Sequence, residues 1–187
     1  MKNEITGMKL RLIVMNFLQF AVWGAYLTSM GTYLFNIGLG AKIGLFYAMQ
    51  GIVSLFMPAI MGIIADRWVP AQKLYGFCHF MAAVFMVAAG WYGYVDGEAV
   101  SFGTLFTFYS LSVAFYMPTL ALTNSVAYTA LDKVKLDPVI AFPPIRIFGT
   151  IGFICSMLLT DILGFQNNYM QFFSCACFGV ILAVYAL

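Results

Sequence analysis

Charge is scarce in this sequence. Only 9% of its 187 residues are Asp, Glu, Lys or Arg, against about 25% in an ordinary soluble domain. So few charged side chains cannot form the polar coat of a soluble fold. Polar stretches of low hydrophobicity are also lacking, which excludes disorder. A net charge of +2 spread without a basic stripe disfavours nucleic-acid binding. The class that remains is a membrane protein.

Apolar side chains are abundant instead, since 63% of the residues are hydrophobic and 18% are aromatic. Charges and turn formers divide them into long continuous segments, each near the 20 or so residues that a helix needs to cross the hydrocarbon core. A β-barrel would show short segments of alternating polarity. We therefore predict an all-α membrane protein of six transmembrane helices. The predicted spans are 10–36, 43–65, 74–95, 100–131, 139–163 and 168–187.

The cations are distributed unevenly between the loops. Seven of them fall in the N-terminal tail and in the second and fourth loops: Lys2, Lys9, Arg11, Arg67, Lys73, Lys133 and Lys135. By the positive-inside rule, both ends of this segment are expected in the cytoplasm. The chain stops at Leu187 inside an apolar run, with no charged residue after Asp161. We therefore expect it to be a piece of a larger protein, cut within or just after the sixth helix.

Clusters of reactive side chains are missing as well. The four cysteines all lie in predicted spans and show no metal-site spacing, so we interpret them as packing residues. A membrane-embedded enzyme would need clustered His, Asp, Glu or Cys, and this chain has one histidine and isolated acids. We predict no catalytic residue and no metal site. The groups that remain as candidates for proton binding are His79 and, nearer the outer surface, Asp161.

Arg146 is the one cation that lies well inside a predicted span, since Arg11 is at the very start of the first one. An arginine at a helix centre costs about 2.5–3.5 kcal/mol on insertion scales, so it needs a reason. It either extends to the cytoplasmic surface or pairs with Asp132 or Asp137, or it faces a water-filled cavity and binds a polar solute. Thr150 and Phe153 follow at i+4 and i+7, which places a cation, a hydroxyl and an aromatic ring on one helix face. Such a face suits a planar polar ligand.

The first span carries a second polar stripe. Gln19, Trp23 and Tyr26 recur at i, i+4 and i+7, with Asn16 before them. Amides in the membrane must find partners, so this face is expected to look into the bundle. Its residues serve either as interhelical contacts or as solute contacts. Gly24 is expected to permit close helix packing.

An acid and a base end the second span. Asp66 and Arg67 follow Gly62 at the cytoplasmic side of the helix. Such a pair can hold an inward gate closed, or it can be an ordinary charge pair at the membrane surface. Its place in the second loop favours the gating interpretation.

These residues also belong to longer motifs. The segment Gly62-Ile63-Ile64-Ala65-Asp66-Arg67 resembles the loop signature of the major facilitator superfamily, although Trp68-Val69-Pro70-Ala71-Gln72-Lys73 replaces its usual glycine and arginines. Three further blocks resemble the bacterial nucleoside:proton symporter family. They are Phe17-Leu18-Gln19-Phe20 with Trp23-Gly24, Tyr116-Met117-Pro118-Thr119-Leu120, and Phe142-Pro143-Pro144-Ile145-Arg146 with Gly149-Thr150-Ile151-Gly152-Phe153.

The resemblance implies that residues 1–187 form the N-terminal six-helix half of a twelve-helix transporter in the bacterial inner membrane. It implies nucleoside uptake with a proton as the coupling ion and no other cofactor. Arg146, Thr150 and Phe153 occupy positions of the family's nucleoside site, and we add Gln19 and Trp23 as candidate contacts. The expected partners are a nucleoside, the lipid bilayer and the C-terminal six-helix half, which would also hold the proton-coupling acid.

Other functions remain open at this point. The chain fits a superfamily transporter of another small polar solute, such as a sugar or a drug. It also fits a six-helix assembly module that does not itself transport. Uptake of a labelled nucleoside by the full-length protein, challenged with other solutes, separates these alternatives.

Overall fold

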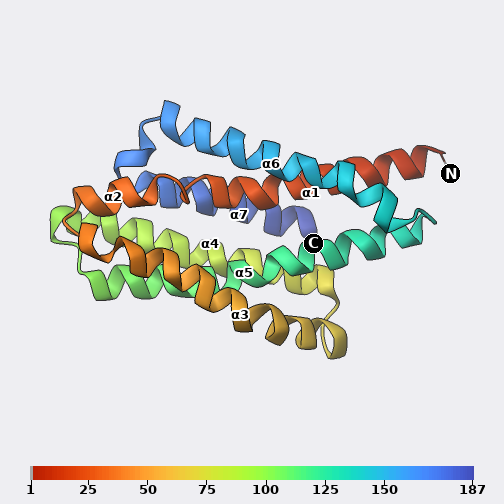
Figure 1. Ribbon diagram of the computed structural model, residues 1–187, viewed down its shortest axis with the longest axis horizontal. Coiled ribbons are helices and arrows are strands. Elements are labelled where there is room, and N and C mark those ends of the chain that lie inside the picture. The colour runs from red at the N-terminus through yellow and green to blue at the C-terminus, as the bar shows by residue number, and fades with distance from the viewer. Residues whose placement is uncertain (1) are drawn as a thin grey trace.

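The computed structural model describes residues 2–187, and within that range it contains seven α-helices and no strand (Figure 1). Short 3₁₀ turns at 40–42, 97–99 and 165–167 connect some of them. The helices are α1 (Lys2–Gly24), α2 (Met30–Asn36), α3 (Ile43–Arg67), α4 (Ala71–Asp96), α5 (Phe102–Lys133), α6 (Pro138–Ile162) and α7 (Met170–Ala186).

The predicted fold class is confirmed. Within the described range, α1, α3, α4, α5 and α6 are long and apolar enough to cross a membrane, and α7 is an apolar helix of 17 residues. The helices fall where the apolar runs predict them. Asp137 begins α6 as an N-cap, because its carboxylate accepts a 2.9 Å hydrogen bond from the backbone N–H of Val139.

The first predicted span differs from the expected single helix over 10–36, because the structure interrupts it at residues 25–29. Carbonyl groups in the interruption bond to side chains of other helices. The Thr160 hydroxyl of α6 donates to the Ala25 carbonyl at 3.0 Å, and the Tyr47 hydroxyl of α3 donates to the Leu27 carbonyl at 2.7 Å. An interrupted helix is tolerated in a membrane where neighbouring side chains satisfy its backbone in this way.

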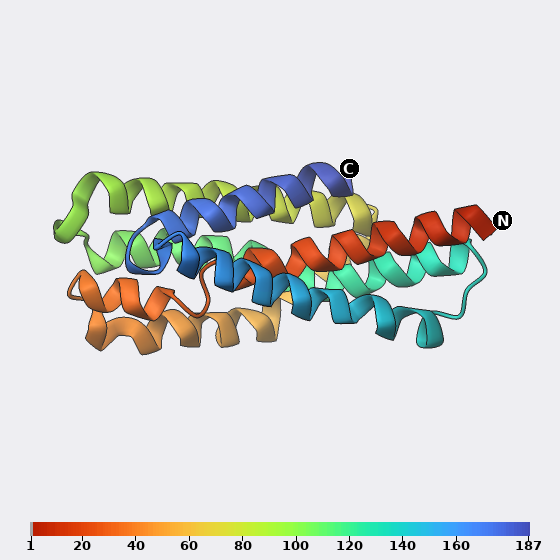
Figure 2. The ribbon, with the colours of Figure 1, turned by 90° about the horizontal axis from the view of Figure 1, so that it is seen from above.

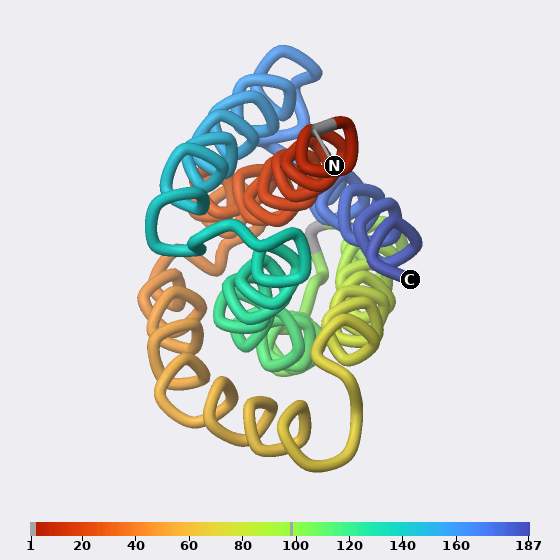
Figure 3. Tube along the Cα trace, turned by 90° about the vertical axis from the view of Figure 1, so that its right-hand side faces the viewer, coloured from red at the N-terminus to blue at the C-terminus, as the bar shows by residue number. Residues whose placement is uncertain are grey.

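Helices α1 and α5 lie in the middle of the bundle, with the other long helices around them (Figure 3). The closest pairings are α1 with α6, and α4 with both α7 and α5, while α3 packs mainly on α5. The N-terminus, the α3–α4 turn and the α5–α6 turn gather at one end of the bundle (Figure 1). The start of α1 and the last turns of α5 extend beyond the end of α7 (Figure 2).

Glycines allow α1 and α6 to approach closely. A Cβ atom on Gly24 would collide with the Phe153 carbonyl oxygen, and one on Gly152 would collide with the Phe17 carbonyl oxygen. These are backbone contacts, which cannot move aside as a flexible side chain can. The packing role expected for Gly24 is confirmed, and the α1–α6 seam sets where the side chains of both helices meet.

Candidate functional site

Arg146 projects from α6 toward α1 and is half-buried. Its guanidinium carbon lies 4.0 Å from the centroid of the Phe20 ring, which is a cation–π arrangement. Among the described residues, the guanidinium has neither an ion-pair partner nor a hydrogen-bond acceptor. Asp137, one of the acids considered as its partner, caps its own helix instead. The guanidinium donors therefore stay available for a ligand.

An aromatic cluster continues from this cation. The Trp23 ring centroid lies 6.4 Å from that of Phe20, 6.2 Å from that of Tyr116, and 6.2 Å from that of Phe153 in an edge-to-face arrangement. Trp23 and Phe153 are each only partly buried. We call Phe20, Trp23, Phe153 and Arg146 the α1–α6 wall. Three of the residues predicted from sequence thus come together, and Phe20 is the member that sequence reasoning missed.

Thr150 lies one turn after Arg146 on α6 and is exposed. Its hydroxyl has no hydrogen-bond partner among the described residues. Together with Arg146 it offers polar groups beside an apolar aromatic surface, which suits a ligand with hydrogen-bonding groups and a flat ring.

Gln50 of α3 is a further residue that the sequence reasoning missed. Its Oε1 accepts a 3.0 Å hydrogen bond from the Trp23 indole N–H, and its Nε2 donates a 2.7 Å bond to the Tyr109 hydroxyl. Its position as a lone amide in an apolar run, about midway along the predicted span 43–65, was the available signal, by the same reasoning that picked out Gln19.

Gln19 lies on the other side of α1 and is completely buried. Its Oε1 accepts hydrogen bonds from Tyr75 at 2.7 Å and Thr123 at 3.0 Å, and lies 2.8 Å from Nε2 of His79. Its Nε2 donates to the Thr119 hydroxyl at 2.9 Å, and the Tyr116 hydroxyl donates to its backbone carbonyl at 2.8 Å. We call this set the Gln19 network. It ties α1 to α4 and α5, and it meets the α1–α6 wall at Tyr116, whose ring centroid lies 6.2 Å from that of Trp23.

The remaining predicted residues lie away from the α1–α6 wall. His79 is completely buried and belongs to the Gln19 network, whereas Asp161 is exposed near the end of α6. Asp66 and Arg67 are exposed at the end of α3, and neither forms an ion pair with any side chain that the structure describes. Their gating role stays a prediction.

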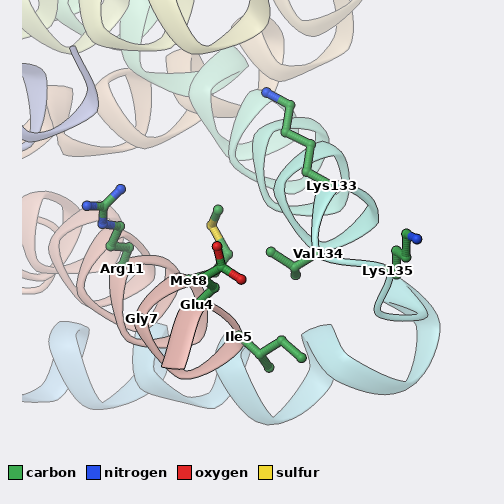
Figure 4. A pocket seen from close by; sticks show the side chains of 8 residues that line it. All are labelled: Glu4, Ile5, Gly7, Met8, Arg11, Lys133, Val134 and Lys135. Carbon is green, nitrogen blue, oxygen red and sulfur yellow. The ribbon is translucent and has the colours of Figure 1, made fainter. Parts of the chain in front are cut away.

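A wide hollow in the structure lies apart from the α1–α6 wall. A cavity of about 790 Å³ lies between the first turns of α1 and the end of α5 (Figure 4). The cavity is lined by Glu4, Ile5, Gly7, Met8, Arg11, Lys133, Val134 and Lys135. The Arg146 surface is an open wall on the bundle, so cavity size alone does not point to it.

Fold and site together define a polytopic α-helical membrane protein that carries an unpaired cation beside aromatic rings within its spans. The particular family follows from comparison with known proteins. The model of the nucleoside H⁺ symporter family matches residues 6–187, and the chain belongs to that family.

Two curated relatives and a solved structure agree with this. The xanthosine permease of Escherichia coli is 40% identical over 181 residues, which cover 95% of this chain and 41% of that relative. The nucleoside permease NupG of Escherichia coli is 38% identical over 184 residues, covering 97% of this chain and 42% of that relative. The crystal structure of the nucleoside transporter NupG superimposes with a TM-score of 0.87, covering 96% of this chain and 43% of the other. The chain therefore spans less than half the length of its curated relatives.

Proposed function

We propose that this chain forms the N-terminal six-helix half of a transporter that carries nucleosides together with protons across the bacterial inner membrane. The two halves rock about a site between them, so that the site opens to one side of the membrane at a time. Membership of the nucleoside H⁺ symporter family supports this, as do relatives that are named as xanthosine and nucleoside permeases. The relatives are transporters, and the proposed activity involves no catalytic step.

The Arg146 guanidinium is the observation that carries the proposal. A cation within a membrane span is expensive, and here no acid among the described residues compensates it. Phe20 shields one face of the guanidinium, while its N–H donors have no acceptor on the described part of the chain. A solute with oxygen acceptors would satisfy them, and the cost of the buried charge is then explained by ligand binding.

A nucleoside matches the α1–α6 wall in chemistry. The Arg146 and Thr150 donors would hydrogen-bond to ribose hydroxyls or base oxygens. Phe153 would stack on the base, and Trp23 would contact the base from the side. Gln19, also proposed from the sequence as a contact, has its amide oxygen and nitrogen engaged inside the bundle. This geometry favours its role as an interhelical contact.

Helices α3 and α6 have the surfaces that a second half would cover. They have the smallest buried shares of the long apolar helices, and their exposed apolar residues include Leu55 at 74% and Ile147 at 60% exposure. Thr150 is exposed on α6 as well. We propose that the C-terminal half packs near these helices and supplies the rest of the nucleoside site.

We place the proton-coupling acid in that second half. His79, the histidine of this chain, is buried and its Nε2 lies against Gln19. Both ends of the segment lie in the cytoplasm in this proposal, because the cation-bearing turns gather at the N-terminal end of the bundle (Figure 1). Asp66 and Arg67 would then act at the inward gate.

The test is uptake of radiolabelled uridine by cells that express the full-length protein. Arg146→Ala is expected to abolish uptake while expression and membrane insertion stay normal, because no described residue forms a hydrogen bond or an ion pair with the guanidinium. Excess adenosine should compete with uridine in the wild-type protein, and excess glucose should not. Normal uptake by the Arg146→Ala variant would refute the site, and competition by glucose would indicate a different solute class.

A further inference from the structure

The buried side chains of α3 are Phe46, Gln50, Val53 and Met61, and Gln50 is the polar one among them. It is only 6% exposed, although α3 as a whole has the lowest buried share of the long apolar helices. A buried amide in the middle of an apolar span is costly unless its hydrogen bonds are made. The partners of Gln50 therefore indicate why it is there.

The chemistry of these partners fixes the orientation of the amide. The Trp23 indole N–H can only donate, so it requires the amide oxygen of Gln50, which lies 3.0 Å away. The amide nitrogen then points to the Tyr109 hydroxyl at 2.7 Å. Tyr109 is itself completely buried, with its ring edge-to-face against Tyr26. Gln50 thus connects the partly buried Trp23 to a completely buried part of the core.

Trp23 in turn contacts most of the α1–α6 wall. Its ring touches Phe20, on which the Arg146 guanidinium lies, and meets Phe153 edge-to-face. The side chain of tryptophan has two rotatable bonds, and the hydrogen bond to Gln50 holds its indole N–H in one direction. If Gln50 is removed, the ring is free to turn toward another acceptor, and the surface offered to a ligand changes.

We propose that Gln50 is a positioning residue that fixes the plane of Trp23 and thereby the affinity of the wall for the nucleoside base. This inference rests on the proposed function, since it assigns Trp23 to the nucleoside site. Gln50 acts through Trp23 and need not touch the substrate.

A double-mutant cycle on the full-length purified transporter tests this, with uridine binding measured by calorimetry. Gln50→Leu keeps the approximate shape of the side chain and removes both hydrogen bonds. We expect uridine affinity to fall about tenfold, the change that corresponds to one lost hydrogen bond in the interior. In a Trp23→Phe background the same substitution should change affinity less than about twofold, because the indole on which Gln50 acts is gone.

Two further variants separate positioning from general stability. Gln50→Glu keeps an acceptor for the indole N–H and should retain most of the wild-type affinity. Gln171→Leu removes another buried amide, whose Oε1 accepts a 2.9 Å hydrogen bond from Ser29. This change should lower thermal stability and leave uridine affinity unchanged. An equal loss of affinity in the Trp23 and Trp23→Phe backgrounds, or no loss in either, would overturn the proposal.

Tryptophan emission provides a readout that does not need a substrate. Gln50→Leu should shift the emission spectrum in the wild-type background and leave it unchanged in the Trp23→Phe background, where the other tryptophans remain. If the wild-type protein binds no nucleoside, the proposed function fails, and this spectral comparison alone still decides whether Gln50 holds Trp23. An unchanged spectrum with Trp23 present would mean that it does not.

Discussion

The two sides of α1 meet the rest of the bundle in opposite ways. On one side, Gln19 is completely buried, and both its amide oxygen and its amide nitrogen have partners on α4 and α5. On the other side, the neighbouring Phe20 lies under the Arg146 guanidinium, whose donors have no acceptor on the described part of the chain. The two regions begin at adjacent residues, and one is closed while the other is open.

This difference separates polar groups that hold helices together from polar groups that we propose to bind a ligand. The Gln19 network lies between two apolar clusters of the core, with Leu18 in one and Val22 in the other. A satisfied amide there links three helices in a fixed register. The Arg146 charge has no comparable role in the bundle, and the comparison predicts that stability and transport respond to different substitutions.

The largest effect on stability is expected at the seam that supports the wall. In Gly152→Ala the new Cβ would collide with the backbone of Phe17, so α1 and α6 must separate. We expect a loss of about 3 kcal/mol or more, comparable with other severe backbone or packing conflicts. The measurement is thermal unfolding of the purified protein in detergent.

Gly51→Ala is the matched control, because it also adds a methyl group to a glycine within a helix. No atom lies within 4 Å of the added Cβ, and the helix propensity of alanine should leave stability equal or slightly higher. Equal melting temperatures for the Gly152 and Gly51 variants would show that the seam is not tightly packed.

A smaller loss of stability is expected when the hydrogen bonds of the Gln19 network are removed. Gln19→Leu leaves the Tyr75 hydroxyl without its acceptor, and His79 and the Thr119 hydroxyl lose their contacts with the amide as well. Unpaired buried groups cost about 1–3 kcal/mol each in soluble proteins and less in membranes, so we expect about 2 kcal/mol in total. The measurement is the melting temperature of Gln19→Leu compared with that of Arg146→Ala. The arginine variant should keep the wild-type melting temperature. The comparison fails if Arg146→Ala is the less stable of the two.

The smallest effect is expected at Thr150. Thr150→Val removes a hydroxyl that no described residue contacts and keeps the shape of the side chain, so stability should change by less than about 0.5 kcal/mol. If the hydroxyl binds the nucleoside, KM for uridine uptake should rise about threefold to tenfold, the equivalent of one modest hydrogen bond. Initial uptake rates over a range of uridine concentrations measure this. An unchanged KM would remove Thr150 from the site.

Much of the candidate site could be picked out from single residues. Arg146 is identified by its cost in a membrane, and the spacing of Thr150 and Phe153 follows from helix periodicity. Phe20 and Gln50 were missed because nothing local distinguishes a phenylalanine in an apolar run, and because a lone amide does not reveal its partner. The interruption at residues 25–29 was missed for a similar reason. It depends on hydroxyls of Thr160 and Tyr47, which are distant in sequence.

The sequence by itself determined the class of protein and the approximate positions of most of its apolar helices, because both depend on counting apolar residues and charges along the chain. It also showed that Arg146 needs a partner. Only the tertiary structure decided that the Gln19 amide is engaged inside the bundle, and that the Arg146 guanidinium stacks on Phe20 without an acceptor on the described part of the chain. Hydrogen bonds and ring contacts between helices depend on how the helices rotate against each other. In this protein that rotation is set by the close α1–α6 packing at Gly24 and Gly152.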